Sequence, residues 1–216
     1  MKNGHFDSCI APNECWCEIK RYSFVFILAL IIFATEVAGG IISGSLALFA
    51  DAGHVLADAI AILVSIVTAH YVRIKQWREK SVRTMGGIIN ALLLLIIAIW
   101  IGFEGVGRIY YPRDIASKTM MVVAMFGTLG NWLQYKILGT LAEEHITHKA
   151  MRLHILSDLL QSIAVVLGGV AIYFTQKHII DPVLSMVIAL WMVWRAWDLI
   201  FYIKEGGSHH HKHHHH

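Results

Sequence analysis

Long apolar segments separated by short polar ones recur along the whole chain. Six of them have the length of about 20 residues that a helix needs to cross the hydrocarbon core of a bilayer. They are Phe24–Ser43, Ala47–Tyr71, Thr84–Gly107, Thr119–Leu138, Met151–Phe174 and Pro182–Ile203. Short connections make consecutive helices antiparallel neighbours. The pattern therefore predicts an all-α integral membrane protein, a six-transmembrane-helix bundle with short loops.

The composition agrees with this prediction. Of the 216 residues, 56% are hydrophobic and only 15% are charged, whereas about a quarter of the residues in soluble domains are charged. Polar residues fill the segment before the first span, without the order typical of a cleavable secretory signal. We expect a cytoplasmic tail containing cysteine and histidine (1–22), a six-helix transmembrane domain (23–204) and a His-rich tail (205–216) that is either a tag or native.

The positive charges predict an orientation. Most of the 18 Lys and Arg residues fall in the N-terminal tail, in connections on the same side, or near the end of the chain, where we count Arg195 and Lys204. The opposite side receives Arg108, Arg113, Lys118 and Lys177. Because cytoplasmic loops carry an excess of Lys and Arg, both termini are expected to be cytoplasmic. The short loops and the missing signal suit a bacterial plasma (inner) membrane.

One five-residue motif occurs twice, in the second and fifth spans. Residues 54–58 read HVLAD and residues 154–158 read HILSD. Residues four apart share one face of a helix, so His54 points in the same direction as Asp58, and His154 in the same direction as Asp158. A period of three spans reverses the direction through the membrane. This inverted-repeat character makes helices 2 and 5 equivalent, as in transporters that bind substrate near the midplane.

The two motifs together have the composition of a metal site. Facing each other, they supply two nitrogens and two oxygens, a tetrahedral set that zinc accepts. Each intramembrane aspartate costs about 2.5–3.5 kcal/mol, and either one Zn²⁺ or two protons would balance the two carboxylates. Histidine titrates near pH 6.5, so we expect metal to exchange for protons here. The alternative is that each His–Asp pair is a buried hydrogen bond that stabilises the bundle.

The sequence around the motifs resembles the cation diffusion facilitator family of zinc transporters. The similar stretches are SGSLALFADAGHVLADAIAIL, GGIINALLLLIIAIWIGFEGVGRIYYP, HKAMRLHILSDLLQSIAVVLGGVAIYF and IIDPVLSMVIALWMVWRAW. The resemblance implies a proton-coupled exporter of divalent cations, not an enzyme, with His54, Asp58, His154 and Asp158 as the transport-site ligands. Histidine at the first position of both motifs implies Zn²⁺ as the transported substrate. Cd²⁺ or Co²⁺ could accompany it, because ligand type separates these ions poorly.

The end of the chain departs from the family pattern. Members usually continue after the sixth helix into a cytosolic metal-binding domain that helps them dimerise, whereas here GGSHHHKHHHH follows Glu205. We therefore expect a form that lacks this domain or is truncated before it. A homodimer would then form through transmembrane helices, with the third span as the first choice. The expected partners are divalent metal ions, protons and the lipid bilayer, and no nucleic acid.

Further polar residues inside the spans are candidates for a proton path or for orienting the ligands. These are Asp51, Glu36, Asn90, Asn131 and Gln161. Asp51 lies three residues before His54 on the same face, and its alternative role is to cap the start of the helix. For the other four, the alternative is a hydrogen bond between helices.

A second group of candidates lies on the expected cytoplasmic side. Thiolate and imidazole are zinc ligands, so these residues could capture metal before it enters the membrane; the alternative is a solvated tail and loop without metal. They are His5, Cys9, Cys15, Cys17, His145 and His148.

Three other functions are compatible with parts of the pattern. An intramembrane metalloenzyme would keep one zinc position open, but four protein ligands would fill it, and the sequence contains no HExxH. A haem-bearing electron carrier with His54 and His154 as axial ligands would leave Asp58 and Asp158 unexplained. A metal-binding sensor without transport would use the same four residues, and the sequence does not separate it from a transporter.

Overall fold

The computed structural model describes residues 12–72, 79–139 and 146–204, and these residues form helices joined by short turns. The helices are α1 (Pro12–Ser43), α2 (Leu46–Val72), α3 (Glu79–Tyr110), α4 (Ser117–Gly139), α5 (Ile146–Thr175) and α6 (Ile180–Lys204). Within these ranges there is no strand. The predicted all-α bundle is therefore confirmed, although α1, α3 and α5 begin ahead of the apolar segments that they contain.

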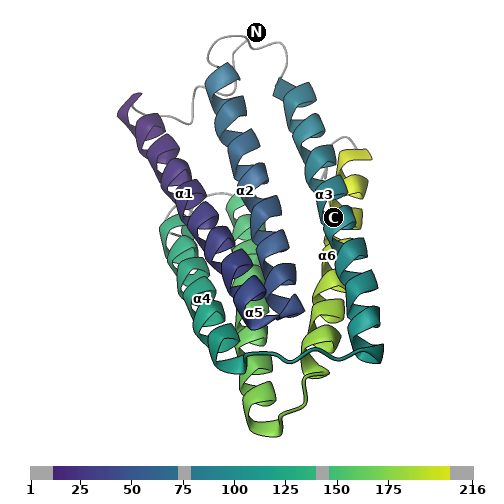
Figure 1. Ribbon diagram of the computed structural model, residues 1–216. Helices are drawn as coiled ribbons and strands as arrows, with labels where there is room; N and C mark the ends of the chain where they lie inside the picture. Colours follow the sequence, from purple (N-terminus) through teal and green to yellow (C-terminus); the bar gives the residue numbers. More distant parts are fainter. Residues whose placement is uncertain (1–11, 73–78, 140–145, 205–216) are drawn as a thin grey trace, which may run out of the picture.

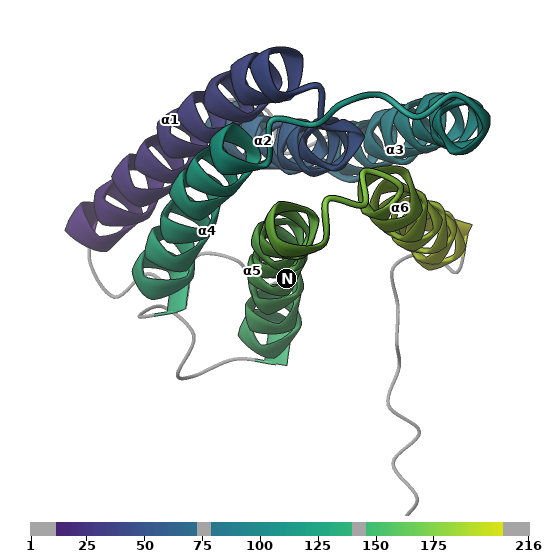
Figure 2. The same ribbon diagram turned by 60° about the horizontal axis from the view of Figure 1, so that its bottom comes forward.

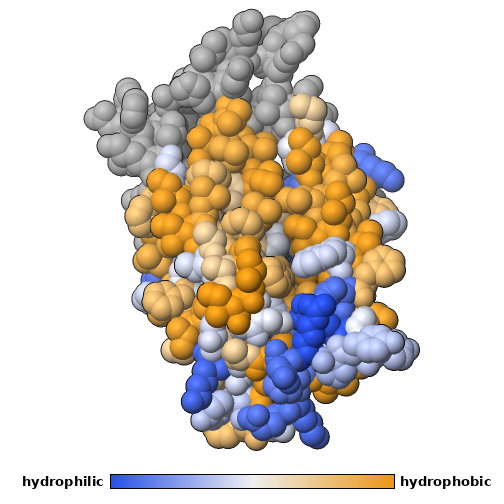
Figure 3. Space-filling view, in the orientation of Figure 1, coloured by the Kyte–Doolittle hydropathy of each residue, from blue (hydrophilic) through white to orange (hydrophobic). Residues whose placement is uncertain are grey.

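Among the residues that the structure describes, five helices are long and apolar enough to cross a membrane. Their apolar segments are Ser23–Ser43, Leu46–Val64, Thr84–Tyr110, Leu156–Thr175 and Ile180–Phe201. The fourth predicted span corresponds to α4, which is less apolar because it carries Asn131, Gln134 and Lys136. Apolar side chains cover much of the surface in Figure 3, and polar residues gather at its lower end. Outward-facing apolar side chains on long helices are what a lipid environment requires.

The helices form two rows of three, with α2 and α5 in the middle of each row. Figure 2 shows α1, α2 and α3 in one row and α4, α5 and α6 in an arc that faces it. Across the rows, α1 packs against α4, α2 against α5 and α6, and α3 against α6; Figure 1 shows the same helices from the side. The repeated motifs therefore lie on the central helix of each row, as the inverted-repeat prediction requires.

The first turn of α2 is held by the start of α6. The chain reverses at Gly44, whose φ of +73° is favourable for glycine. The Asp181 carboxylate accepts hydrogen bonds from Ser45 Oγ (2.6 Å) and from the backbone N–H groups of Leu46 (2.7 Å) and Ala47 (3.1 Å). Arg108 of α3 donates to the carbonyl of Gly44. These contacts satisfy N–H groups that a helix start leaves unpaired and fix where α2 begins.

Candidate metal site

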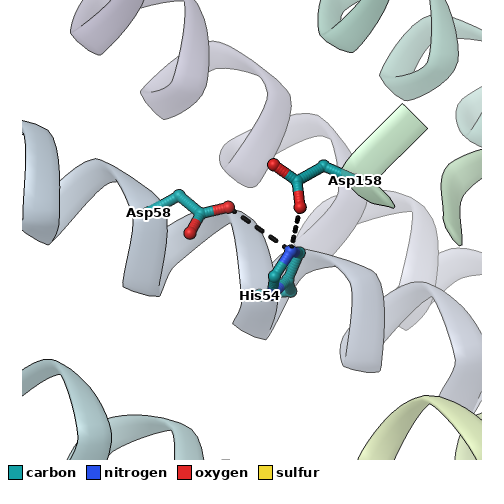
Figure 4. A group of neighbouring side chains, drawn as sticks. All are labelled: His54, Asp58 and Asp158. Atoms are coloured by element: carbon teal, nitrogen blue, oxygen red, sulfur yellow. Dashed lines mark hydrogen bonds and ion pairs between the residues drawn. The ribbon is translucent and has the colours of Figure 1, made fainter. Parts of the chain in front are cut away.

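Three of the four predicted ligands come together between α2 and α5. His54 and Asp58 on α2 and Asp158 on α5 each offer a ligand atom, and these atoms all lie within 4.8 Å of one another. His54 Nε2 is 2.7 Å from Asp158 Oδ1 and 3.4 Å from Asp58 Oδ2 (Figure 4). We call these three residues the His54 cluster. One nitrogen and two carboxylates converging at this separation are suited to a divalent cation such as Zn²⁺.

The local sequence explains why these side chains converge. The four-residue spacing puts His54 and Asp58 on one face of α2, and that face is turned toward α5. Small residues let the neighbouring helices approach closely. At Gly53, for example, an added Cβ would lie 2.6 Å from a side-chain carbon of Ile97 on α3. His54 is consequently buried, with 1% of its side chain exposed, whereas Asp58 keeps 20% and Asp158 keeps 12%.

The fourth predicted ligand, His154, lies on α5 one turn before Asp158. Its side chain is outside the part of the chain whose side chains are described. The proposal of a fourth ligand therefore stands on the helical spacing alone, while the other three stand on the interatomic distances in the structure.

Arg195 is a member of the site that the sequence analysis missed. Its Nη1 atom donates to Asp158 Oδ1 at 2.9 Å and lies 3.2 Å from His54 Nε2. In the sequence analysis this residue is counted only among the charges at the cytoplasmic end of the chain. In the structure, α6 packs against both α2 and α5, and the guanidinium lies against the His54 cluster. The signal was available: a single arginine interrupts the apolar run of the sixth span, and such residues usually face the bundle interior.

A second buried polar group lies closer to the start of α2. Asp51 is fully buried, and its carboxylate accepts hydrogen bonds from Gln161 Nε2 (3.0 Å) and Ser162 Oγ (2.9 Å) of α5. Asn131 of α4 donates to Ser162 Oγ at 2.8 Å. Together with Glu36 of α1, these residues form what we call the Asp51 cluster.

This arrangement excludes the capping role for Asp51. The helix begins at Leu46, and Ser45 Oγ accepts the hydrogen bond from Leu48 N at 3.2 Å that a cap provides. Asp51 lies inside the helix instead.

Glu36 is the unusual member of the Asp51 cluster. It is fully buried in α1, and neither of its carboxylate oxygens has a hydrogen-bond donor among the described residues. Asp51 of α2 is the acidic group that interacts electrostatically with it. Gly127 of α4 makes room for it, since a Cβ there would be 2.2 Å from Glu36 Oε1. Two neighbouring buried acids are costly when both are ionised, so a proton or a cation is needed to balance their charge.

The remaining candidates are not brought to either cluster by the described contacts. Asn90 lies on α3, and its buried Oδ1 has no hydrogen-bond partner in the described ranges. Cys15 and Cys17 on α1 and His148 on α5 have side chains outside the described set, and His5, Cys9 and His145 lie outside the described residues altogether. Metal capture by these residues stays a prediction.

Comparison with known proteins gives one consistent result. Residues 23–203 match the family described as the cation efflux transmembrane domain. The zinc transporter ZitB of Pectobacterium atrosepticum is 35% identical over 84% of this chain and 58% of its own length. The metal cation efflux system protein CzcD of Cupriavidus metallidurans is 33% identical over 93% of this chain and 63% of its own length. A cadmium, cobalt and zinc/H(+)-K(+) antiporter of Bacillus velezensis is 28% identical over 88% of this chain and 63% of its own length. The chain thus spans less than two thirds of the length of these relatives.

Proposed function

This chain belongs to the cation efflux family, a family of transporters and not of enzymes, and from that membership we propose that it is a secondary active transporter. It exports Zn²⁺ from the cytoplasm in exchange for protons. Cd²⁺ and Co²⁺ are further proposed substrates, because nitrogen and oxygen ligands separate these ions poorly and because they appear in the name of a relative.

The observation that carries the proposal is the convergence of His54, Asp58 and Asp158 within 4.8 Å. Their single nitrogen and two carboxylates offer Zn²⁺ three of its four usual ligands, and we propose His154 as the fourth. A divalent cation neutralises the two carboxylates, which are otherwise costly inside a membrane. The partial exposure of both aspartates gives the ion a way in and out.

We assign the Asp51 cluster to proton transfer. Glu36 and Asp51 are both fully buried, so the hydrated metal cannot reach them without large rearrangement, whereas a proton can. Asp51 lies one turn before His54 on α2, which puts the proton-carrying pair next to the metal ligands along the same helix. Gln161 and Ser162 keep the Asp51 carboxylate oriented through their hydrogen bonds, and Asn131 orients Ser162.

The chain is a multi-pass membrane protein, with five helices suited to crossing the bilayer. We further propose that it resides in a bacterial inner membrane with both termini in the cytoplasm, as the charge distribution predicts.

A homodimer through the transmembrane helices is also proposed. The outward apolar side chains of α3, such as Ile96 and Phe103, support that helix as the contact, and chemical cross-linking between copies in membranes tests it.

A flux assay in proteoliposomes tests the function directly. The purified chain is reconstituted with a zinc-sensitive dye inside the vesicles, and a pH gradient is imposed. We expect zinc to move against its own gradient, and a protonophore to stop this movement. Binding of zinc without any flux would instead identify a metal sensor, and flux that ignores the protonophore would refute the exchange with protons.

A further inference from the structure

The guanidinium of Arg195 contacts the same atoms that would bind the metal. Its Nη1 lies 2.9 Å from Asp158 Oδ1 and 3.2 Å from His54 Nε2, and those two atoms are themselves only 2.7 Å apart. An arginine side chain can donate hydrogen bonds but cannot accept them or lose its proton. The 2.7 Å contact between His54 Nε2 and Asp158 Oδ1 is a hydrogen bond only when Nε2 carries the proton. The guanidinium therefore donates to Asp158 Oδ1, and its positive charge lies beside Nε2, where a metal ion would bind.

Two cations cannot share these acceptors. A metal ion bound to His54 Nε2 and Asp158 Oδ1 would lie close to the positive charge of Arg195, in a buried region where screening by water is weak. The guanidinium and the metal therefore exclude each other. For the metal to bind, the Arg195 side chain has to withdraw, and this side chain is not enclosed, since 17% of it is exposed.

We propose that Arg195 is a tethered cation that competes with the transported metal for Asp158 and His54. This inference rests on the proposed function, because it takes the His54 cluster as the transport site. While the metal is absent, the guanidinium neutralises part of the charge on Asp158 and lowers the cost of keeping this carboxylate in the membrane. When the metal is bound, the nearby guanidinium weakens binding and favours release. Arg195 thus sets the metal affinity of the site.

A purely structural role for Arg195 makes the opposite prediction. If the arginine only held Asp158 in the orientation needed for metal binding, removing it would weaken zinc binding. Under competition, removing it strengthens binding. The sign of the change in zinc affinity therefore separates the two roles.

The test measures zinc dissociation constants of the purified full chain by competition with a fluorescent chelator. Arg195→Gln keeps most of the side-chain length without the charge, and we expect it to bind zinc at least about tenfold more tightly, a change of about 1.4 kcal/mol. Zinc release, followed by stopped-flow mixing with excess chelator, should slow by a similar factor. Arg113→Gln is the matched control, because Arg113 is 65% exposed and pairs with Glu104 away from the site; its zinc affinity should not change.

A second variant, Arg195→Ala, keeps the proposal testable if Arg195→Gln does not fold. It also allows a measurement whose result a purely structural role for Arg195 would not change. In Arg195→Ala, free guanidinium ion added to the buffer should weaken zinc binding, whereas the same concentration should leave the wild type unaffected. Should Arg195→Gln fail to fold, this competition and the affinity of Arg195→Lys decide the question. Equal or weaker zinc affinity in folded variants would overturn the proposal. If the wild type itself binds no zinc, the proposed function fails first, so the two failures are distinguishable.

Discussion

Two buried polar clusters connect α2 to α5, and their negative charges are balanced in different ways. In the His54 cluster, the carboxylate of Asp158 pairs with the guanidinium of Arg195 at 2.9 Å. In the Asp51 cluster, the described partners of the Asp51 carboxylate are the neutral groups of Gln161 and Ser162, and Glu36 faces it as a second acid. The first cluster therefore has a cationic partner in the structure, whereas we propose that a proton balances the acids of the second.

The acidic side chains of the two clusters also differ in how much of them is exposed. The side chains of Asp58 and Asp158 are 20% and 12% exposed, whereas Glu36 and Asp51 are completely buried. A metal ion arrives with a hydration shell and needs a route that water can enter, while a proton can pass along hydrogen-bonded groups. The comparison teaches that burial depth, more than the identity of the acids, separates the proposed metal site from the proposed proton site.

The largest expected effect comes from removing a ligand in the His54 cluster. Asp158→Asn preserves the shape of the side chain but removes its charge, which takes away both a metal ligand and the partner of Arg195. We expect zinc flux to fall by at least about 100-fold, equivalent to about 2.8 kcal/mol, when it is measured in proteoliposomes. Asp198→Asn serves as the control, since Asp198 is an exposed acid on α6. Normal flux in Asp158→Asn would remove the basis for distinguishing the two clusters.

The corresponding change in the Asp51 cluster should separate the effect on zinc binding from the effect on the coupling of zinc transport to protons. Glu36→Gln replaces the buried acid with a neutral group of the same size, so the shared proton is no longer needed. We expect zinc affinity to stay within about twofold, while zinc accumulation driven by a pH gradient drops by about tenfold or more, a loss of about 1.4 kcal/mol in coupling.

Two measurements on each variant make this outcome unambiguous. Chelator competition gives the affinity, and vesicle accumulation gives the coupling. Glu104→Gln, a change at a half-buried acid of α3 that pairs with Arg108, should alter neither. Undiminished accumulation in Glu36→Gln would show that protons take another path.

Sequence periodicity predicted the convergence of the His54 cluster for a simple reason. A four-residue spacing fixes one face of a helix, and the repeated motif appears on two helices that short loops force to be neighbours. The positions of Glu36 and Arg195 could not be obtained in that way. Glu36 meets Asp51 only because of the depth at which α1 packs against α2, and the apolar pattern leaves this register open. The position of Arg195 was not predicted because the charge count considers only the side of the membrane and not which helices the guanidinium contacts.

A smaller effect is expected from making the His54 cluster resemble the Asp51 cluster chemically. Replacing both His54 and His154 with Asp gives a site of carboxylates only, and oxygen ligands favour Mn²⁺ more than imidazole does. We expect the ratio of manganese to zinc transport to rise by roughly tenfold, about 1.4 kcal/mol, in flux assays with each metal. An unchanged ratio would argue that pocket shape, and not ligand type, sets the selectivity.

The smallest effect should come from the edge of the Asp51 cluster, where only stability is affected. Asn131→Ala removes the donor to Ser162 Oγ (2.8 Å), but Ser162 still donates to Asp51 at 2.9 Å. We expect the free energy of unfolding to fall by about 1 kcal/mol, the usual net value of one such hydrogen bond, as a lower midpoint in thermal unfolding. Zinc affinity should stay at the wild-type level, because Asn131 contacts no member of the His54 cluster through a described hydrogen bond. A loss of zinc binding in this variant would mean that the two clusters act as one network, and the division between a metal site and a proton site would have to be abandoned.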